Sequence, residues 1–375
     1  MQVTPSLNAG GVETITLDIA GAVVEARGRS LVASQGGRLE TDLARAGAVL
    51  IRLPVDSRNP ITLWRNIARL ETLIRREGVS VVHVRSRAPA FSAIAAARRA
   101  GVPVVTTYHG IYGARSPLKR WYNGVMTRGD LVIANSDFTR DHIVAEHCVS
   151  ADKIVVIAEG IDTALFDPVA VSVTRRNDMR AVFGLATGDL RPVMLLPARL
   201  TNWKGHAVVI EALARLDRRE TPLLIVTGRS DGGEYLNSLR LRVGELGLTE
   251  QVRFVGETAD MPAAYALADV VVAPSLKAES FGRSVVEAGA MATPVIASPL
   301  GGPVETVIAG ETGWFAPAGD IDAWARAIDA ALNQSDRRLA EMGRAARARA
   351  CSLYSRDVMA AATLAVYRRL LDRQT

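Results

Sequence analysis

The fold is decided by residues 270–305, which read V-V-V-A-P-S-L-K-A-E-S-F-G-R-S-V-V-E-A-G-A-M-A-T-P-V-I-A-S-P-L-G-G-P-V-E. Their periodicity predicts a buried strand over 270–273, a loop over 275–280, a helix over 281–292, a second strand over 294–297 and a further helix after Gly301-Gly302-Pro303. Two successive strand–loop–helix units indicate parallel strands, with both loops at the carboxyl edge of the sheet. That edge is where open α/β sheets bind their ligands.

Two carboxylates lie in this stretch, Glu279 in the loop and Glu287 in the helix, with seven residues between them. Because a helix rises ~1.5 Å per residue, we expect roughly 12 Å between the two groups along its axis. That is too far for two carboxylates that act on one bond, and it suits one elongated ligand held at both ends. The alternative is that Glu279 only complements the helix dipole and Glu287 lies on a solvated face.

The chain has 375 residues, of which 49% are hydrophobic, and this length exceeds what one ordinary core accommodates. In a first domain, strands are expected over 30–33, 49–53, 79–84, 102–107, 131–134 and 154–157, with helices between them, most clearly over 62–77 and 89–99. In a second domain, strands are expected over 193–196, 223–227 and 252–255, before the two strands described above. We therefore expect an α/β fold with two Rossmann-like domains, the first over 1–168, a linker over 169–190 and the second over 191–354.

The chain carries a net charge of +6 and has a pI near 9.6, so anionic partners are expected. Nucleic acid is disfavoured, because aromatic residues are only 5% of the chain and no basic run is interleaved with them. No apolar run approaches the ~20 residues of a membrane-spanning helix, and the first residues do not resemble a signal peptide. Cys148 and Cys351 form no CxxC pair, which argues against a disulfide framework or a zinc cluster. The expected location is the cytoplasm, including the inner face of the cytoplasmic membrane.

Three further motifs stand out, and two of them lie where expected strands end. Arg199 and Lys204 flank a strand-to-helix turn, and two cations beside a helix N-terminus match the charge of a diphosphate. Gly10-Gly11 precedes a helix and would let a ligand approach its free N–H groups, although a tight turn is the simpler interpretation of these glycines alone. His109 follows another strand, where a ligand contact and a structural hydrogen bond are both open. The chain has neither a G-x-G-x-x-G after its first strand nor a G-x-x-x-x-G-K-[ST], which argues against a nicotinamide enzyme and a P-loop enzyme.

The segment E-S-F-G-R-S-V-V-E, from Glu279 to Glu287, resembles the E-x7-E element of retaining glycosyltransferase family 4, also called glycosyl transferases group 1. A-R-L-T-N-W-K-G at 198–205 is similar to the family's G-R-L-x-x-x-K-G, with Ala198 in place of its first glycine. E-G-I-D-T-A-L-F at 159–166 is similar to its N-G-V-D-x-x-x-F, with Glu159 in place of asparagine. The resemblance covers essentially the whole chain. It implies the GT-B fold, in which two Rossmann-like domains face each other across a cleft and the last helix, here 355–375, crosses back onto the first domain.

The resemblance also implies roles for individual residues. Glu279 would contact the donor sugar and Glu287 the nucleotide ribose, while Arg199 and Lys204 would hold the diphosphate. His109 would lie near the sugar hydroxyls and the anomeric centre. The expected catalytic residues are His109, Arg199, Lys204 and Glu279, and the expected donor-binding residues are Gly10, Gly11, Arg199, Lys204, Phe281, Gly282, Glu287, Gly301 and Gly302.

The function that the resemblance implies is transfer of a sugar, with retention of configuration, from a nucleotide-diphosphate sugar to a hydroxyl acceptor. Arg199, Lys204 and backbone N–H groups near Gly301-Gly302 would neutralise the leaving phosphate, which would take the acceptor's proton. Neither a cofactor nor a metal is expected. The D-x-D at 320–322 is not taken as a metal site, because Asp320 stands directly before a helix and is interpreted as its N-cap. Two alternatives stay open: a sugar-nucleotide epimerase of the same fold, which needs no acceptor, and a binding protein that never turns the nucleotide sugar over.

General similarity to bacterial envelope glycosyltransferases makes a glycan or glycolipid of the lipopolysaccharide or exopolysaccharide class the leading acceptor. Residues 116–128, S-P-L-K-R-W-Y-N-G-V-M-T-R, are expected to form a basic helix that carries Trp121 and Tyr122. A surface helix of this kind can rest on an anionic membrane, where a lipid-linked acceptor would be found, and it can equally be a solvated face.

Overall fold

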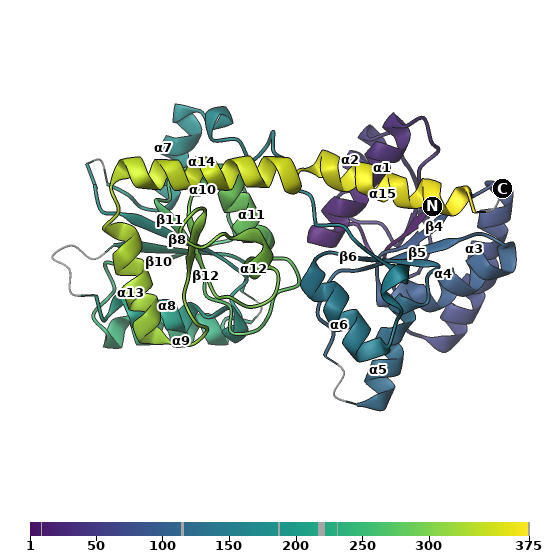
Figure 1. The fold of residues 1–375 in the computed structure, drawn as a ribbon, viewed down its shortest axis with the longest axis horizontal. Coiled ribbons are helices and arrows are strands. Elements are labelled where there is room, and N and C mark those ends of the chain that lie inside the picture. The colour runs from purple at the N-terminus through teal and green to yellow at the C-terminus, as the bar shows by residue number, and fades with distance from the viewer. Residues whose placement is uncertain (9, 114–115, 187, 217–221, 231, 374–375) are drawn as a thin grey trace. The chain divides into compact units, whose positions relative to one another are not determined.

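The computed structural model of the protein describes residues 1–8, 10–113, 116–186, 188–216, 222–230 and 232–373. The chain forms two compact units, residues 1–160 together with 356–375, and residues 161–355 (Figure 1). Each unit is a parallel sheet of the Rossmann type with helices packed on its faces, so the predicted α/β fold class is confirmed (Figure 1).

The first unit has a seven-stranded sheet in the order β3-β2-β1-β4-β5-β6-β7. Its strands are β1 (Gln2–Val3), β2 (Leu31–Ser34), β3 (Val49–Arg52), β4 (Val82–Val84), β5 (Val104–Tyr108), β6 (Leu131–Ala134) and β7 (Ile154–Val156). Its helices are α1 (Gly11–Glu25), α2 (Glu40–Arg45), α3 (Pro60–Arg76), α4 (Arg87–Ala100), α5 (Pro117–Asn123), α6 (Asp137–His147) and α15 (Arg356–Leu371). The strand order reverses at β1, which pairs with β2 on one side and β4 on the other, so the loop after β1 opens at a topological switch point.

Helix ends in this unit follow from local sequence. Asn59 caps α3 by accepting a hydrogen bond from the Ile61 N–H at 2.9 Å. Pro60 takes the first helical position, where no partner for an N–H is needed. Ser136 caps α6 by accepting from the Thr139 N–H at 3.0 Å.

The C-terminal helix α15 packs against α1 within the first unit. Its Tyr367 hydroxyl lies 2.6 Å from His83 Nδ1, and His83 Nε2 lies 2.6 Å from Thr107 Oγ1. Burial lowers the pKa of His83 well below its usual value, so the ring stays neutral and bridges the two hydroxyls. This buried chain of hydrogen bonds ties α15 to β4 and β5.

The second unit has a six-stranded sheet in the order β10-β9-β8-β11-β12-β13. Its strands are β8 (Val193–Pro197), β9 (Leu223–Thr227), β10 (Val252–Gly256), β11 (Val270–Ala273), β12 (Val295–Ala297) and β13 (Gly313–Phe315). Its helices are α7 (Val173–Val182), α8 (His206–Leu213), α9 (Glu234–Glu245), α10 (Met261–Tyr265), α11 (Arg283–Ala290), α12 (Pro303–Thr306), α13 (Ile321–Leu332) and α14 (Asp336–Leu353). The strand order reverses between β8 and β11, so the loops after these two strands flank the second switch point.

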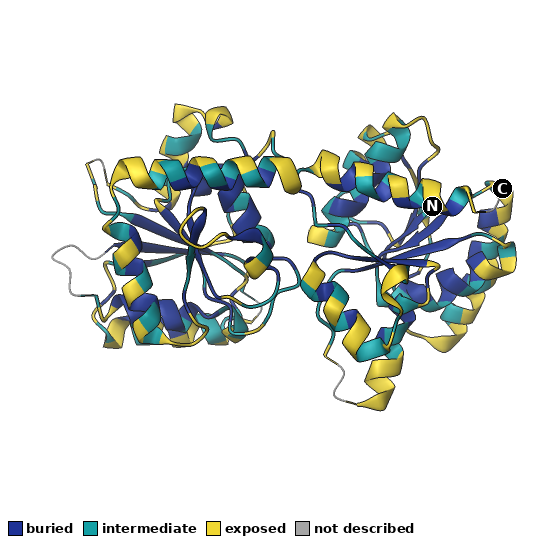
Figure 2. Ribbon diagram, viewed as in Figure 1, coloured by how far each residue is buried: buried dark blue, intermediate teal, exposed yellow. Residues whose placement is uncertain are grey.

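The central strands of both sheets are buried on both faces and are dark blue in Figure 2, whereas the edge strand β3 is exposed or half-buried along its length. Val270, Val271 and Val272 of β11 are each 0% exposed, which is why this strand has no polar alternation in its sequence. Full burial of one valine side chain stabilises the fold by roughly 1.5–3 kcal/mol. Apolar burial therefore fixes β11 and, with it, the position of the loop that follows.

The basic segment 116–128 does not form one continuous helix. Helix α5 ends at Asn123 and is followed by a 3-10 turn, η1 (Gly124–Thr127). Asn123 is fully buried and accepts a hydrogen bond from Arg87 Nη1 at 2.7 Å, so contacts with α4 fix the break. Within the part of the chain that the structure describes, no helix has the length and apolar character needed to cross a membrane.

The range 169–190, which we expected to be a linker, lies within the second unit and contains α7. Arg175 on α7 pairs with Asp260, with 2.6 Å between Nη2 and Oδ1. Asp260 also caps α10 through the Ala263 N–H, so this ion pair joins the two helices. Helix α7 has few apolar residues, so no hydrophobic pattern in the sequence indicated this tertiary contact.

Candidate active site

Three loops adjoin at the carboxyl edge of the second sheet, because β8, β11 and β12 are neighbouring strands. The Leu276 N–H after β11 donates to Trp203 O after β8 at 2.7 Å. The Gly302 N–H after β12 donates to Glu279 O after β11 at 2.8 Å. These loops carry seven of the predicted site residues: Arg199, Lys204, Glu279, Phe281, Gly282, Gly301 and Gly302.

Lys204 and Glu279 form an ion pair, with 2.8 Å between Lys204 Nζ and Glu279 Oε1. Ser275 Oγ donates to the same carboxylate oxygen, and the Lys204 ammonium lies 4.5 Å from the ring centroid of Trp203. Only 16% of the Lys204 side chain and 14% of the Glu279 side chain are exposed. An ammonium has three donors, so its bond with Glu279 leaves donors for an anionic ligand. Arg199 is exposed on the same loop.

The backbone after Lys204 is fixed by a glycine. Lys204 ends the 3-10 turn η4 (Asn202–Lys204), and Gly205 follows with a φ of 75° as the N-cap residue of α8. A Cβ at Gly205 would lie 1.9 Å from Pro274 O, so only glycine allows both this backbone conformation and the close approach of the two loops. The N-terminus of α8 therefore begins beside the Lys204–Glu279 pair, where its N–H groups add partial positive charge.

The Glu287 carboxylate on α11 is held from two sides. Arg283 Nε, one turn earlier on the helix, donates to Oε1 at 2.9 Å, and the Tyr265 hydroxyl donates to Oε2 at 3.1 Å. The pKa of Tyr265 is raised well above its usual value by burial and, secondly, by the Glu287 charge, so the phenol keeps its proton. Only 15% of the Glu287 side chain is exposed, which contradicts the alternative that it lies on a solvated face.

The glycine pair after β12 packs against the backbone of the β11 loop. A Cβ at Gly301 would lie 2.2 Å from Glu279 O, and one at Gly302 would lie 2.3 Å from Phe281 O. The Gly302 N–H donates to Glu279 O, and this hydrogen bond holds the glycine pair against the loop after β11. The Phe281 side chain is 3% exposed and packs edge-on against Tyr354, so a donor contact by Phe281 would come from its main chain.

In the first unit, Gly10 and Gly11 follow β1 at the switch point and are both exposed. Gly10 is the N-cap residue of α1. A Cβ at Gly10 would lie 2.4 Å from Glu13 Oε2, so the Glu13 carboxylate covers this glycine at the positive end of the helix dipole. A phosphate at this helix N-terminus would have to displace the Glu13 side chain.

His109 follows β5 and belongs to a row of polar side chains along the first sheet. Glu159 Oε1, after β7, lies 3.5 Å from His109 Nδ1, and Asn135 Nδ2, after β6, donates to the same oxygen at 2.9 Å. A cavity of about 10 Å³ lies among these side chains and the buried Arg85. Such a volume holds at most one water molecule. The His109 imidazole, 7% exposed, is thus packed in a polar cluster in this structure.

Comparisons with known proteins identify the family. Residues 9–165 match the family model Glycosyltransferase Family 4, and residues 180–349 match Glycosyl transferases group 1. A GDP-mannose-dependent alpha-(1-6)-phosphatidylinositol monomannoside mannosyltransferase of Mycolicibacterium smegmatis is 32% identical over 90% of this chain and 89% of its own length. The chain belongs to glycosyltransferase family 4.

Solved structures agree with the GT-B fold. A glycosyltransferase from Rickettsia africae aligns with a TM-score of 0.89 and 29% identity over 99% of this chain and 98% of its own. HepE of Anabaena, in complex with UDP, aligns with a TM-score of 0.83 and 25% identity over 98% of this chain and 100% of its own. As a member of family 4, the protein is a glycosyltransferase that takes its sugar from a nucleotide sugar.

Two side chains that hold Glu287 in this family-4 protein were not singled out from the sequence. Arg283 stands four residues before Glu287 on a helix, and that spacing alone could have predicted the ion pair. Tyr265 gave no such signal, because its contact with Glu287 depends on how α10 packs against α11. Ser275 and Glu159 were visible as residues after strands, and only the structure shows which carboxylate or imidazole each one approaches.

The D-x-D at 320–322 is part of a helix N-terminus in this glycosyltransferase. Asp320 caps α13, accepting from the Ala323 N–H at 2.9 Å, which confirms the predicted N-cap. Asp322 pairs with Arg215. Among the described residues, no group of three or more histidine, cysteine, aspartate or glutamate side chains is arranged to hold a metal ion. Cys148 and Cys351 are both free thiols.

Proposed function

We propose that this family-4 enzyme transfers a sugar, with retention of configuration and without a metal ion, from a nucleotide-diphosphate sugar to a hydroxyl of a bacterial envelope glycan or glycolipid. The observation that carries the proposal is the Lys204–Glu279 pair, which lies beside the N-terminus of α8 on neighbouring loops. It offers a cation for a diphosphate and a carboxylate for a sugar hydroxyl at one switch point.

In the proposed reaction, Arg199 and Lys204 bind the diphosphate, Glu279 binds the donor sugar and Glu287 binds the ribose. The bond between the anomeric carbon and the phosphate oxygen breaks, and a bond from that carbon to the acceptor oxygen forms on the same face. The acceptor's proton passes to the leaving diphosphate, whose developing charge the two cations stabilise. From the first unit, Gly10, Gly11 and His109 are proposed to approach the diphosphate and the sugar when donor is bound.

The nucleotide and the acceptor are proposed from the relatives. The mycobacterial relative is named for GDP-mannose and for a phosphatidylinositol glycolipid, and HepE was solved with UDP. GDP and UDP are therefore the first nucleotides to test. A lipid-linked acceptor of the lipopolysaccharide or exopolysaccharide class is proposed alongside a phosphoinositide glycolipid, and all three would be met at the cytoplasmic face of a membrane.

Two measurements test this function, first of nucleotide binding and then of turnover. A panel of UDP, GDP, ADP and their common sugars is screened by thermal shift, where a ligand at 100-fold over its Kd should stabilise the fold by ~2.7 kcal/mol. We expect one nucleotide to raise the melting temperature of the wild type and to lose that effect in Glu287→Ala. The matching nucleotide sugar is then incubated with lipid acceptors. Release of an altered sugar without an acceptor would identify an epimerase, and binding without any turnover would identify a binding protein.

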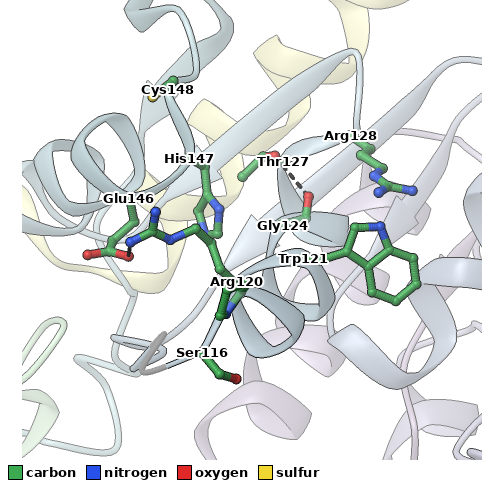
Figure 3. Close-up of a pocket in the computed structure, with 10 residues that line it drawn as sticks. Ser116, Arg120, Trp121, Gly124, Thr127, Arg128, Glu146, His147 and Cys148 are labelled. Atoms are coloured by element: carbon green, nitrogen blue, oxygen red, sulfur yellow. Dashed lines mark hydrogen bonds and ion pairs between the residues drawn. The ribbon is translucent and has the colours of Figure 1, made fainter.

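A contact with anionic membrane is proposed for the surface around α5. A cavity of about 610 Å³ opens beside this helix, lined by Arg120, Trp121, Arg128, His147 and their neighbours (Figure 3). Leu118 and Trp121 are 75% and 55% exposed, so apolar side chains stand next to cations on one short helix. That combination favours the boundary between anionic headgroups and acyl chains.

A further inference from the structure

We propose that Tyr265 is a positioning residue for ribose recognition, and that the Tyr265–Glu287 pair makes the site selective for a nucleotide with free 2′- and 3′-hydroxyls. The proposal rests on the proposed function, in which Glu287 binds the ribose, and it adds the residue that sets the orientation of that carboxylate. Tyr265 acts through Glu287 and does not itself touch the nucleotide.

The Glu287 carboxylate has a fixed orientation because each of its oxygens receives a donor from the protein. Tyr265 donates to Oε2 at 3.1 Å and Arg283 donates to Oε1 at 2.9 Å. A carboxylate has about four lone-pair directions, which is more than these two bonds use. Two neighbouring hydroxyls of a ribose present two donors side by side, which matches two carboxylate oxygens held in one plane.

Tyr265 can hold the Glu287 carboxylate in that plane, because several contacts fix the position of Tyr265 itself. It is 0% exposed, and its ring packs edge-on against Phe166 with 6.1 Å between centroids. Its carbonyl oxygen accepts a hydrogen bond from Thr293 Oγ1 at 3.2 Å. The phenol therefore cannot follow Glu287 to another rotamer. If the carboxylate moved away, the buried hydroxyl would keep only a weaker partner, the Ser284 carbonyl at 3.4 Å.

The chemistry of the pair is that of a neutral donor on a charged acceptor. Burial keeps the Tyr265 phenol protonated, and a hydrogen bond to a carboxylate is stronger than one between neutral groups. Loss of such a bond should free the carboxylate to rotate. Ligands that bind both carboxylate oxygens should then bind more weakly. Ligands without ribose hydroxyls should be indifferent to the change.

The test compares Tyr265→Phe with the wild type by calorimetric titration of UDP and GDP and of their 2′,3′-dideoxy counterparts. For the nucleotide that binds, we expect the wild type to prefer the ribonucleotide. Tyr265→Phe should weaken ribonucleotide binding roughly tenfold and leave dideoxynucleotide binding unchanged. A purely structural role for the hydroxyl would weaken both ligands equally, and that result would overturn the proposal.

Matched variants separate this inference from the proposed function. Tyr235→Phe makes the same change at a tyrosine on α9 that packs against His206, and it should keep the wild-type preference. Glu287→Gln should lose the preference as Tyr265→Phe does. A wild type that binds both ligands equally overturns the inference alone, whereas a wild type that binds no nucleotide at all overturns the proposed function.

A structural measurement covers the case in which Tyr265→Phe does not fold. In a crystal structure of the wild type with the bound nucleotide, we expect both ribose hydroxyls within hydrogen-bond distance of Glu287 and the Tyr265 hydroxyl still on Oε2. Ribose hydroxyls bound elsewhere, or a carboxylate that has left Tyr265, would overturn the proposal.

Discussion

Lys204 Nζ lies 2.8 Å from Glu279 Oε1, so the cation proposed for the diphosphate is held by the carboxylate proposed for the donor sugar. Both side chains are about 15% exposed, and water screens their attraction little. The pair can keep Lys204 extended toward the site before any donor arrives. A bound diphosphate would then add a second anion to an ammonium whose position is already fixed, which lowers the entropic cost of forming the site.

The first prediction concerns Lys204→Ala, which removes a cation from the leaving group and leaves the Glu279 carboxylate with Ser275 as its remaining side-chain donor. We expect transfer to slow by roughly 10²–10³, the usual cost of one lost transition-state donor. We also expect the free energy of unfolding to fall by about 2 kcal/mol, because a largely buried charge loses its partner. Steady-state kinetics and urea denaturation measure the two effects.

A double variant separates these two effects. Lys204→Met combined with Glu279→Gln removes both charges, so stability should recover while transfer stays slow. Lys153→Ala, on η2 (Ala151–Lys153) of the first unit, controls for loss of a lysine elsewhere. Near-normal transfer by Lys204→Ala would show that this lysine does not bind the diphosphate.

The segment from β11 to α12 could be predicted from sequence because every local signal agreed. An apolar run ended by Pro274, a helical spacing ended by Pro294 and a glycine pair before Pro303 all specify the same order of elements. Strand β13 was missed, since G-W-F is three residues long and its strand character comes from pairing with β12. Helix α7 was missed because it buries little apolar surface, with Met179 as its buried residue, so no helical apolar pattern marks it.

The candidate site, like the fold, could be predicted from the sequence only in part. Residues adjacent to strand ends could be found from sequence, because the carboxyl edge of a parallel sheet collects them. Their partners could not, since Tyr265 and Glu287 are 22 residues apart and meet only through packing. The hydrogen bond from the Gly302 N–H to Glu279 O also joins two loops, and no local pattern in the sequence indicated it.

The second prediction concerns acid stability and His206, the first residue of α8. Burial lowers its pKa to about 4, from an ordinary value of 6.5. Between these values the unfolded chain binds a proton that the folded chain does not, so the free energy of unfolding should fall as pH decreases through this window, by about 3 kcal/mol in total. Above pH 6.5 the contribution is fully present. Urea denaturation at several pH values measures the slope.

His206→Gln removes this titration, so its stability should depend less steeply on pH between 6.5 and 4 than that of the wild type. His83 is buried and neutral in both proteins, so its contribution cancels in the comparison. An unchanged slope in the variant would mean that His206 is protonated without cost in the folded state.

The third prediction concerns the membrane surface around α5. In co-sedimentation with vesicles, the wild type should bind phosphatidylglycerol and not phosphatidylcholine, and binding should weaken as salt is raised. Leu118→Ser with Trp121→Ser should reduce binding, since both apolar side chains are exposed. Arg120→Gln should reduce it roughly fivefold, as expected for one cation near an anionic surface.

Trp64→Ser is the matched control for this surface. Trp64 lies on α3 and is 70% exposed, so it tests whether any exposed tryptophan of the first unit promotes binding. Its loss should leave vesicle binding unchanged. Equal binding to both lipids would exclude a specific role for α5. An equal loss of vesicle binding in Trp64→Ser and in the Leu118→Ser, Trp121→Ser variant would exclude it as well.

The fourth prediction compares two glycines, each the second of a Gly-Gly pair at a strand end. Gly302→Ala would place a Cβ 2.3 Å from Phe281 O, so the loops after β11 and β12 must separate. We expect the free energy of unfolding to fall by about 1–3 kcal/mol and the thermal shift by nucleotide to be lost, because Glu279 moves with its loop. Gly11→Ala meets no atom within 4 Å and should leave the melting temperature unchanged. If Gly302→Ala keeps wild-type stability and nucleotide binding, the close contact between these loops does not position Glu279.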